Sequence, residues 1–305
     1  MNDAVLAHLR CPNCGSTLVT LGARGPLRCA RGHSFDLAKQ GYATLTAGRT
    51  PHTGDSTEMI ADRERFLAAG HYAFIADALA AAATTAGSAP TTAGSMPGLV
   101  VDAGTGTGYY LARVLDELPA AVGLGLDVSK PALRRAARSH PRADAARADL
   151  WRPLPLADGS AALILDVFAP RNGGEFHRVL RPDGALLVVT PAADHLAELI
   201  EAFGLIRVDP DKADRVSDNL GTYFTATATS AHRHRMRLNG DEVRTLIGMT
   251  PGARHLPPTA ARTETGDARP HDAQAGETRS GAGDARPAAE TDVTAAIDLT
   301  IYRRA

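Results

Sequence analysis

The feature that most constrains the fold is a glycine-rich turn that follows a short apolar run. Residues 99–108 read LVVDAGTGTG, in which Asp102 is followed by Gly104, Gly106 and Gly108. Glycine permits tight turns and a close approach of the backbone to a ligand, and the start of a following helix offers free N–H groups. A strand that enters a helix through such a turn is typical of a parallel α/β sheet with a ligand at its carboxyl edge.

Further short apolar runs alternate with stretches of helical pattern along the rest of the chain. This alternation indicates successive βα units and predicts a doubly wound, Rossmann-like α/β sheet. The expected strands are Leu99–Asp102, Val122–Asp127, Ala162–Phe168 and Ala185–Thr190, with one more within Thr222–Leu238 and a last one at Val293–Tyr302.

The glycine spacing helps to distinguish between two classes of nucleotide cofactor. The pattern is G-x-G-x-G, unlike the G-x-G-x-x-G of dinucleotide-binding proteins, and Asp102 precedes Gly104 by two positions. Both details favour S-adenosylmethionine bound against Gly104 and Gly106. Asp127 ends the next expected strand, where its carboxylate can accept hydrogen bonds from ribose hydroxyls, although NAD would use such an acid as well and each acid could instead be a helix cap. The predicted fold is that of a class I S-adenosylmethionine-dependent methyltransferase.

All three cysteines lie near the N-terminus, and a histidine follows them. Cys11-x2-Cys14 and Cys29-x3-His33 form two knuckles, which together supply three thiolates and one imidazole. Four such ligands make a closed tetrahedral zinc site with no position for a catalytic water, so the predicted zinc is structural. His52 is a competing fourth ligand outside the knuckle, and the alternative without metal is a set of unconnected buried cysteines.

The chain divides into three predicted regions, a zinc-binding module at residues 1–45, a connector at 46–97 and a methyltransferase domain at 98–305. The formal net charge of the whole chain is −1, but residues 1–50 carry six basic and two acidic side chains, a local net charge of +4. A basic module favours an anionic partner such as RNA, with a merely solvated surface as the alternative. The basic residues are Arg10, Arg24, Arg28, Arg31, Lys39 and Arg49, and the acids are Asp3 and Asp36.

The connector is predicted to hold a helix followed by a flexible linker. Asp55, three residues before Glu58, resembles a capping box and is the expected start of a helix that continues through Leu79. Residues 84–97 are small, polar and proline-bearing, which predicts the linker. Residues 256–292 have few large apolar side chains and are therefore predicted to be a disordered insertion in the methyltransferase domain.

Composition excludes several other classes of protein. The apolar fraction of 44% and the charged fraction of 22% are typical of a globular protein, and no apolar run approaches the roughly 18 residues of a membrane span. The N-terminal residues MNDAVLAHLRCPNC do not place a basic region before a long apolar stretch, so no secretory signal is expected. These features lead us to expect a cytoplasmic protein.

Taken together, these residues resemble a known family, the ribosomal RNA guanine-N1 methyltransferases, which include enzymes that confer resistance to tylosin-type and mycinamicin-type macrolides. The resemblance covers nearly the whole chain except residues 84–97 and 256–292. The matching stretches are CPNC, CARGHSFDLAKQGY, GDSTEM, FLAAGHY, VVDAGTGTGYY, GLDVSK, VFAP, RVLRPDGALLVVTP and MTP.

The resemblance implies a substrate and further site residues. The implied reaction transfers a methyl group to N1 of a guanine in a hairpin of 23S ribosomal RNA that lines the peptide tunnel, with macrolide resistance as a consequence. The zinc ligands are the same cysteines and histidine. The implied cofactor contacts are Tyr72, Gly106, Thr107 and His195, although the residues alone would make Tyr72 a core aromatic and His195 a helix-start residue.

No catalytic residue can be named from the sequence. Family members often carry a cysteine at the position of Thr105, and some carry a basic residue at that of Asp166, so a general base does not carry over. Asp149 and Asp166 are expected in loops that face the cofactor, where Asp149 could bracket the adenine. Structural roles would suit both acids equally well.

Two groups of residues are candidates for contact with RNA. Tyr109, Tyr110 and Phe168 could stack on the target base or pack in the core. The arginines of HRHRMR at residues 232–237 share one face of an expected strand, where they either contact phosphates or are simply solvated. These arginines are Arg233, Arg235 and Arg237.

Two other functions are compatible with the sequence. A small-molecule methyltransferase of the same fold would leave the zinc module unexplained, and a non-catalytic zinc-containing RNA-binding protein would leave the intact glycines and Asp127 unexplained. For the favoured reading, the expected partner is 23S ribosomal RNA, with neither DNA nor a membrane. The sequence leaves a monomer and a homodimer both open.

Overall fold

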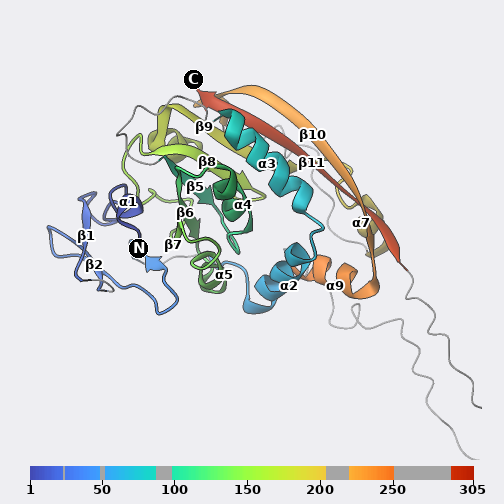
Figure 1. Ribbon diagram of the computed structural model, residues 1–305, viewed down its shortest axis with the longest axis horizontal. Coiled ribbons are helices and arrows are strands. Elements are labelled where there is room, and N and C mark those ends of the chain that lie inside the picture. The colour runs from blue at the N-terminus through green and yellow to red at the C-terminus, as the bar shows by residue number, and fades with distance from the viewer. Residues whose placement is uncertain (23–24, 49–51, 87–97, 204–219, 251–289) are drawn as a thin grey trace, which may run out of the picture.

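An eight-stranded sheet is the central element of the computed structural model (Figure 1). The structure describes residues 1–22, 25–48, 52–86, 98–203, 220–250 and 290–305. The strand order in the sheet is β10-β11-β9-β8-β5-β6-β7-β4. The strands span Ala43–Thr44 (β4), Leu99–Ala103 (β5), Val122–Asp127 (β6), Ala143–Arg147 (β7), Ala161–Val167 (β8), Leu180–Pro191 (β9), Phe224–Leu238 (β10) and Thr291–Arg304 (β11).

The sheet is doubly wound about β5. Strands β6 and β7 follow on one side of β5, strands β8 and β9 lie on the other, and all five are parallel. Strands β5, β6 and β8 are buried almost throughout, which explains their continuous apolar runs. The predicted Rossmann-like fold is confirmed, and the reversal of strand order at β5 places the glycine turn where such sheets bind ligands.

Helices cover both faces of the sheet (Figure 1). Leu79 of α3 and Leu111 of α4 belong to the core on one face, whereas Phe176 of α6 and Leu9 of the N-terminal module belong to the core on the other. Within the described segments no single helix is long and apolar enough to span a membrane, and α2 with α3 reach that length only as a pair bent by 79°. The helices span Asp3–Leu6 (α1), Thr57–Ala68 (α2), Ala73–Ala86 (α3), Tyr109–Glu117 (α4), Lys130–Ala136 (α5), Gly173–Val179 (α6), Ala197–Phe203 (α7) and Gly240–Gly248 (α9).

Two antiparallel strands complete the sheet beyond β9. Strand β11 lies between β9 and β10 and is antiparallel to both. The predicted last strand, Val293–Tyr302, is present, but it starts at Thr291, so Thr291 and Asp292 belong to the sheet and not to the predicted insertion 256–292. Pairing with the end of β10 holds these two residues in the strand, although neither is apolar. Residues 251–289 lie outside the described segments.

The connector contains two helices where the sequence predicted one. The first begins with Ser56, not Asp55, as its N-cap, because the Ser56 hydroxyl accepts a hydrogen bond from the Met59 N–H at 3.2 Å. The chain then turns at Gly70, whose φ of +85° ends α2 in the left-handed conformation that glycine adopts readily. The prediction of Asp55 as the cap and of a continuous helix was therefore wrong.

The predicted linker 84–97 also needs correction at its start. Helix α3 extends to Ala86, and both Ala83 and Ala86 are buried against the core. Alanine has the highest helix propensity, so small residues at this point continue the helix and do not end it. Residues 87–97 lie outside the part of the chain that the structure describes.

The N-terminal module is packed into the body of the protein. Its strands β1 (Leu18–Thr20), β2 (Leu27–Cys29) and β3 (Ser34–Phe35) form a small antiparallel sheet. The Arg10 N–H donates to the Pro155 carbonyl at 2.9 Å, and Leu9 is fully buried among residues of the large sheet. Strand β4 pairs with β7, so residues 1–45 supply one strand of the large sheet. The proposed division into regions remains a prediction.

We predict that the N-terminal module and the large sheet unfold together. Leu9→Ala removes a fully buried side chain from their shared core and should lower the free energy of unfolding by about 2–5 kcal/mol in a single thermal transition. Val19→Ala is the matched control, because Val19 is 55% exposed, and it should change this free energy by less than about 0.5 kcal/mol. Two transitions, of which Leu9→Ala shifts only one, would show that the module is independent.

Candidate active site and zinc site

The glycine turn connects the ends of two neighbouring strands. Gly104, Gly106 and Gly108 have φ values of +80°, +53° and +81°, which side chains with a Cβ rarely adopt. The N–H groups of Gly104 and Thr105 both donate to the Leu126 carbonyl, at 2.8 and 3.0 Å. The turn after β5 is thereby fixed against the last residues of β6.

Gly104 also allows a second loop to approach the turn. A Cβ at this position would lie 2.5 Å from the Cβ of Ala169, in the loop that follows β8. Such contacts are too short for any side chain, so glycine is required by space as well as by φ. The ends of β5, β6 and β8 therefore meet at one place on the carboxyl edge of the sheet.

Asp127 is oriented by two backbone N–H groups. Its Oδ2 accepts a hydrogen bond from the Gly106 N–H at 2.9 Å, and its Oδ1 accepts one from the Ser129 N–H at 2.8 Å. Burial raises the pKa of Asp127, and the two N–H donors oppose that rise. Each carboxylate oxygen keeps a second lone pair, so the fixed carboxylate can still accept hydrogen bonds from the hydroxyls of a ligand.

Asp102 is buried near the end of β5, where the Thr105 side chain lies beside it. The Thr105 hydroxyl donates to Asp102 Oδ2 at 2.6 Å, and the residue is only 1% exposed. Burial raises the pKa of Asp102 to about 7, although the bond from Thr105 opposes the rise. A carboxyl group in this state gains its charge readily when a cationic ligand binds next to it.

Tyr72 and His195 come from distant parts of the chain and lie side by side. The Tyr72 hydroxyl oxygen is 3.5 Å from His195 Nε2, and Tyr72 is only 4% exposed. His195 Nδ1 is 2.8 Å from the Ala296 carbonyl of β11, which holds the ring in place. Burial lowers the pKa of His195 and raises that of Tyr72, so both side chains are uncharged near neutral pH.

Phe168 projects next to this pair from an unusual backbone conformation. Its φ is +54°, its side chain is 41% exposed, and its ring centroid is 5.9 Å from that of His195. Positive φ at a bulky residue is strained, and such strain often marks a functional site. Tyr109 and Tyr110 instead pack edge to face on each other, against the hydrophobic core.

The two acids considered as proton acceptors occupy different environments. Asp166 lies within β8 and is fully buried, so its predicted place in a loop facing the cofactor was wrong. Its Oδ1 is 3.0 Å from Arg171 Nε, but the angle does not make a hydrogen bond. Burial raises the pKa of Asp166 to about 8, and Arg171 opposes that rise. Asp149 does lie in a loop, where its Oδ2 is 3.0 Å from His52 Nδ1.

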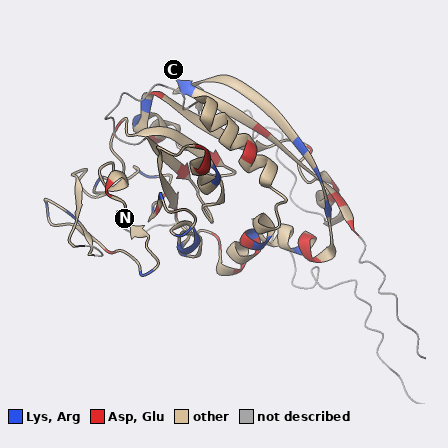
Figure 2. Ribbon diagram, viewed as in Figure 1, with Lys and Arg blue, Asp and Glu red and all other residues tan. Residues whose placement is uncertain are grey.

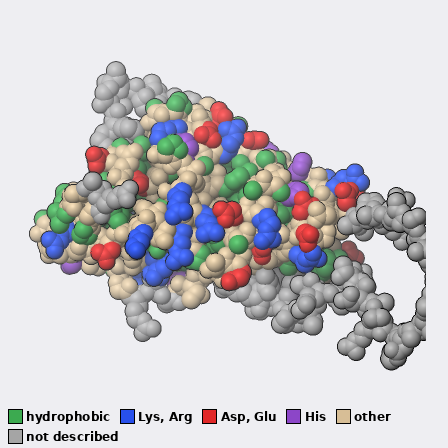
Figure 3. All heavy atoms as spheres, turned by 60° about the horizontal axis from the view of Figure 1, so that its bottom comes forward, with side chains coloured by type: hydrophobic (Ala, Val, Ile, Leu, Met, Phe, Trp, Pro, Cys, Tyr) green, Lys and Arg blue, Asp and Glu red, His purple; other side chains and the backbone are tan. Residues whose placement is uncertain are grey.

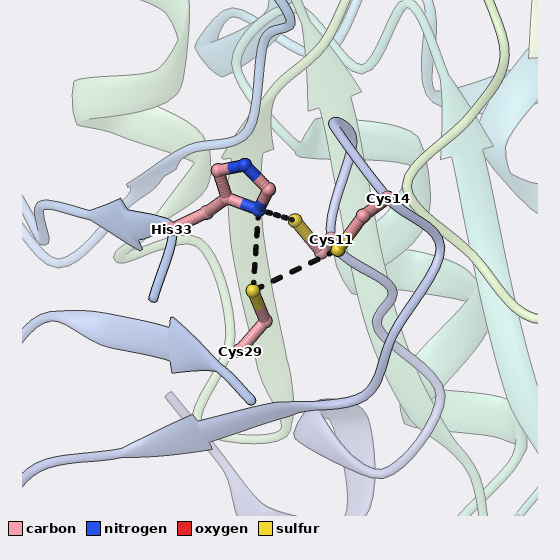
Figure 4. Close-up of side chains that lie close together, drawn as sticks. All are labelled: Cys11, Cys14, Cys29 and His33. Carbon is pink, nitrogen blue, oxygen red and sulfur yellow. Dashed lines mark hydrogen bonds between the residues drawn. The ribbon is translucent and has the colours of Figure 1, made fainter. Parts of the chain in front are cut away.

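The four predicted zinc ligands converge in the N-terminal module (Figure 4). His33 Nδ1 lies 3.5 Å from Cys11 Sγ and 3.3 Å from Cys29 Sγ, and Cys14 Sγ lies 3.7 Å from Cys29 Sγ. Ligand atoms bonded to zinc at about 2.3 Å in a tetrahedron are roughly 3.7 Å apart, so this donor set fits the ion. His52, the competing ligand, is bonded to Asp149 instead.

Local turns hold these ligands in position. The Gly15 N–H donates to the Cys11 carbonyl at 2.8 Å in the first knuckle, and the Gly32 N–H donates to the Cys29 carbonyl at 3.0 Å in the second. Hydrogen bonds with Ser16 lower the pKa of Cys14 to about 6. The thiolate is the form that binds metal, so this shift favours zinc binding near neutral pH.

Both the zinc-binding module and the methyltransferase sheet match known protein families. One family model, the RlmA N-terminal zinc ribbon, matches residues 9–46, and a second, a methyltransferase domain, matches residues 100–184. The chain is 58% identical over 267 residues to a putative 23S rRNA (guanine-N1)-methyltransferase of Micromonospora griseorubida, with 85% of this chain and 90% of the relative covered. The chain belongs to the 23S rRNA (guanine-N1)-methyltransferase family.

Two further relatives agree. The chain is 47% identical over 258 residues to the 23S rRNA (guanine(748)-N(1))-methyltransferase of Streptomyces fradiae, covering 85% of this chain and 90% of the relative. It is 29% identical over 258 residues to a putative 23S rRNA (guanine-N1)-methyltransferase of Bacillus subtilis, covering 81% and 87%. The family resemblance drawn from the sequence is confirmed, and the cofactors of this methyltransferase are S-adenosylmethionine and zinc, as expected.

One side chain near the glycine turn, Arg63, was not singled out from the sequence. Arg63 of α2 is 2.6 Å from Asp55 and donates to the Met249 carbonyl at 3.1 Å, just after α9. It reaches within 3.3 Å of the space that a Cβ of Gly106 would fill, so it faces the glycine turn. Asp55 was expected only as a helix cap and Met249 entered only through the resemblance, and no spacing in the sequence indicates that Arg63 contacts both.

Thr107 differs from the other predicted cofactor contacts because it lies among helices α2, α4 and α5. It lines a hollow of about 770 Å³ between α2, α4 and α5. The predicted cofactor residues Asp102, Gly104, Gly106 and Asp127 share the turn between β5 and β6, while Tyr72 and His195 form the cluster beside Phe168. Their roles toward the cofactor remain predictions.

We predict that Gly106→Arg abolishes binding of S-adenosylmethionine, measured by calorimetry, without loss of zinc, measured by elemental analysis. A side chain at this position would enter the space beside Arg63 that faces the turn. Gly159→Arg is the control for backbone strain, because Gly159 has a similar φ of +56° and nothing within 4 Å of a Cβ. It should leave cofactor affinity unchanged, and full affinity in Gly106→Arg would refute the placement of the cofactor.

We also predict that cofactor binding releases a proton from Asp102. Its carboxyl has a pKa of about 7 before binding, and a cationic amino group nearby would favour the charged form. Affinity for S-adenosylmethionine should therefore rise as the pH is raised from about 6 to about 7.5, and this rise should be absent in Asp102→Asn. Calorimetry in two buffers of different ionisation enthalpy measures the released proton. Identical pH dependence in the wild type and the variant would exclude Asp102 as its source.

Proposed function

We propose that this methyltransferase transfers the methyl group of S-adenosylmethionine to N1 of a guanine in a hairpin of 23S ribosomal RNA. The observation that carries the proposal is the joint match of zinc ribbon and catalytic sheet to guanine-N1 methyltransferases over 85% of the chain. The shared core around Leu9 adds support, because the zinc module is built into the enzyme. A small-molecule methyltransferase would have no evident use for such a module.

The residues at the carboxyl edge suggest how the cofactor is held. Asp127 would accept hydrogen bonds from its ribose, and the backbone at Gly104 and Gly106 would lie against it. The carboxylate of Asp102 would form an ion pair with the charged amino group of the cofactor. Tyr72, Thr107 and His195 follow from the family resemblance, and the two buried, uncharged rings of Tyr72 and His195 would exclude water from its reactive end.

The bound cofactor supplies an electrophilic methyl group, and the protein must bring guanine N1 into line with it. N1 is hidden by pairing and stacking inside a duplex, so the base has to leave its stack, which costs least in a loop or bulge. Phe168 is suited to receive it, because its exposed aromatic ring on a strained backbone stands beside His195, and the next residue, Ala169, lies against the glycine turn. Stacking on such a ring contributes about 1–3 kcal/mol per base.

The N1 proton must also leave during the reaction. Asp166 is sealed inside the sheet next to Arg171, which favours a structural role in holding the loop after β8. Asp149 shares its carboxylate with His52 and with the Trp151 N–H. Neither acid is assigned as a general base, and most of the rate acceleration is attributed to positioning of N1 against the methyl carbon.

Methylation at N1 has a clear chemical readout. The methyl group replaces a Watson–Crick donor and adds bulk, so reverse transcriptase should stop at the modified guanine. We predict one new primer-extension stop in 23S ribosomal RNA treated with enzyme and S-adenosylmethionine, and none with Gly106→Arg, which should lack the cofactor. Lower macrolide binding to ribosomes that carry the modification is the expected consequence if the hairpin lines the peptide tunnel.

Two outcomes would change this conclusion. A wild-type enzyme that binds S-adenosylmethionine but produces no stop in any ribosomal RNA would favour the small-molecule reading. A protein that binds the RNA but not S-adenosylmethionine would favour a non-catalytic RNA-binding role. An unchanged response to macrolides would remove only the proposal of resistance, because the methylation is measured separately.

A further inference from the structure

Three exposed cations follow one another along α5. Lys130, Arg134 and Arg138 are spaced by four residues, so they lie on one side of this helix and of the turn that continues it. At about 1.5 Å per residue, the row spans roughly 12 Å. None of the three forms an ion pair with any other residue that the structure describes. We call these residues the α5 row.

The acids around α5 are already engaged by other groups. Glu64 of α2 pairs with Arg135 at 3.1 Å, and Asp116 of α4 lies 3.4 Å from His140. Asp144 of β7 accepts a hydrogen bond from the Asn2 N–H at 2.6 Å. The positive charge of the α5 row is therefore not neutralised by its described neighbours. Basic side chains gather across the middle of the face on which α5 lies (Figure 3).

Hollows flank the α5 row on both sides. One, of about 770 Å³, is bounded by α2, α4 and α5, and includes Arg134 and Arg138 in its lining. The other, of about 720 Å³, lies between the end of α5 and the N-terminal module, and Arg138 lines it as well. A helix that carries unpaired cations between two hollows can receive an extended anionic chain.

The position of α5 relates this surface to both functional parts of the protein. Lys130 comes three residues after Asp127, and Asp127 is hydrogen-bonded to the glycine turn. At the other end, a Cβ on Gly41 would lie 3.7 Å from the Cβ of Ala137, so the N-terminal module touches the end of α5. The α5 row therefore leads from the zinc-binding module to the cofactor edge of the sheet.

The strand arginines that the sequence suggested as phosphate contacts present a different surface. Arg233 pairs with Asp194, Arg235 with Asp292, and Arg237 with Glu290, at 2.9, 2.9 and 3.2 Å. Each of these arginines of β10 thus has an acidic partner on a neighbouring segment, and basic and acidic positions lie close together at this end of the outer strands (Figure 2). These arginines are exposed, but their charge is balanced locally, so that face offers no net attraction for a polyanion.

We propose that Lys130, Arg134 and Arg138 bind the phosphodiester backbone of the RNA strand next to the target guanine. This inference rests on the proposed function and identifies the surface that would bind the RNA. Contacts with phosphates fix the position and direction of a nucleic acid without reading its sequence. A backbone held along α5 would run from the zinc module toward the cofactor edge of the sheet, so it would set which base reaches the site.

The test compares two variants that each remove three positive charges. Lys130→Gln/Arg134→Gln/Arg138→Gln should raise the KM for a 23S ribosomal RNA hairpin roughly tenfold and leave kcat at saturating RNA unchanged, as expected for uniform binding. Each lost phosphate contact should reduce the slope of log affinity against log salt by about 0.7, so the slope should fall by about 2. Arg233→Gln/Arg235→Gln/Arg237→Gln is the matched control and should leave both quantities unchanged.

A third variant separates charge from structure. Lys130→Arg/Arg134→Lys/Arg138→Lys keeps the charge and should retain the wild-type salt slope. Cofactor affinity and zinc content, measured for every variant, should remain at the wild-type level. The proposal is overturned if the glutamine variant keeps the wild-type KM and salt slope, if the control changes them equally, or if the charge-retaining variant loses as much affinity. Failure of the wild type to methylate RNA would instead refute the proposed function.

Discussion

The hydrogen bond from the Gly106 N–H to Asp127 Oδ2 joins the two strands on which the cofactor site depends. It can form only because the chain after β5 takes three left-handed steps, which place the backbone of the turn above the end of β6. The same turn leaves room for Ala169, so the loop after β8 can close in from the other side. The ends of three parallel strands are therefore held together by a few backbone atoms of the glycine turn, and the side chains of the cofactor site are placed around this turn.

The zinc site adds a different kind of constraint. A segment as short as the N-terminal module has little apolar area to bury by itself, and a metal with four ligands compensates for this. Leu9 and Leu27 nevertheless belong to the same core as residues of the large sheet, and β4 extends that sheet at its edge. Metal ligation and hydrophobic packing therefore stabilise one continuous body, and the orientation of the module toward α5 is fixed by packing.

Local patterns in the sequence predicted the glycine turn and six strands of the large sheet, although β4 and β7 were not among them, and the four proposed zinc ligands do lie close together. The cap at Ser56 was missed since Asp55 is equally suited by type, and only the bond to Met59 distinguishes them. Contacts between segments that are far apart in the chain could not be derived from the spacing of residues in the sequence. Arg63 reaching Met249, and His52 engaging Asp149, result from tertiary packing. The burial of Asp166 was also missed: the residue falls within the predicted strand Ala162–Phe168, but an acid there does not reveal whether its side chain is buried or faces a ligand.

Strand β11 lies inside the sheet, between two strands that precede it in the chain. Strand β10 pairs only with β11 among the described strands, and His195 is held by Ala296 of β11. During synthesis, the edge of β9 therefore stays open, and β10 has no partner, until the ribosome has made the chain through Arg304. Non-local pairings of this kind form late in folding. The cluster around His195 is completed only at that stage, so a chain in which β11 has not yet been made and paired holds an unfinished site.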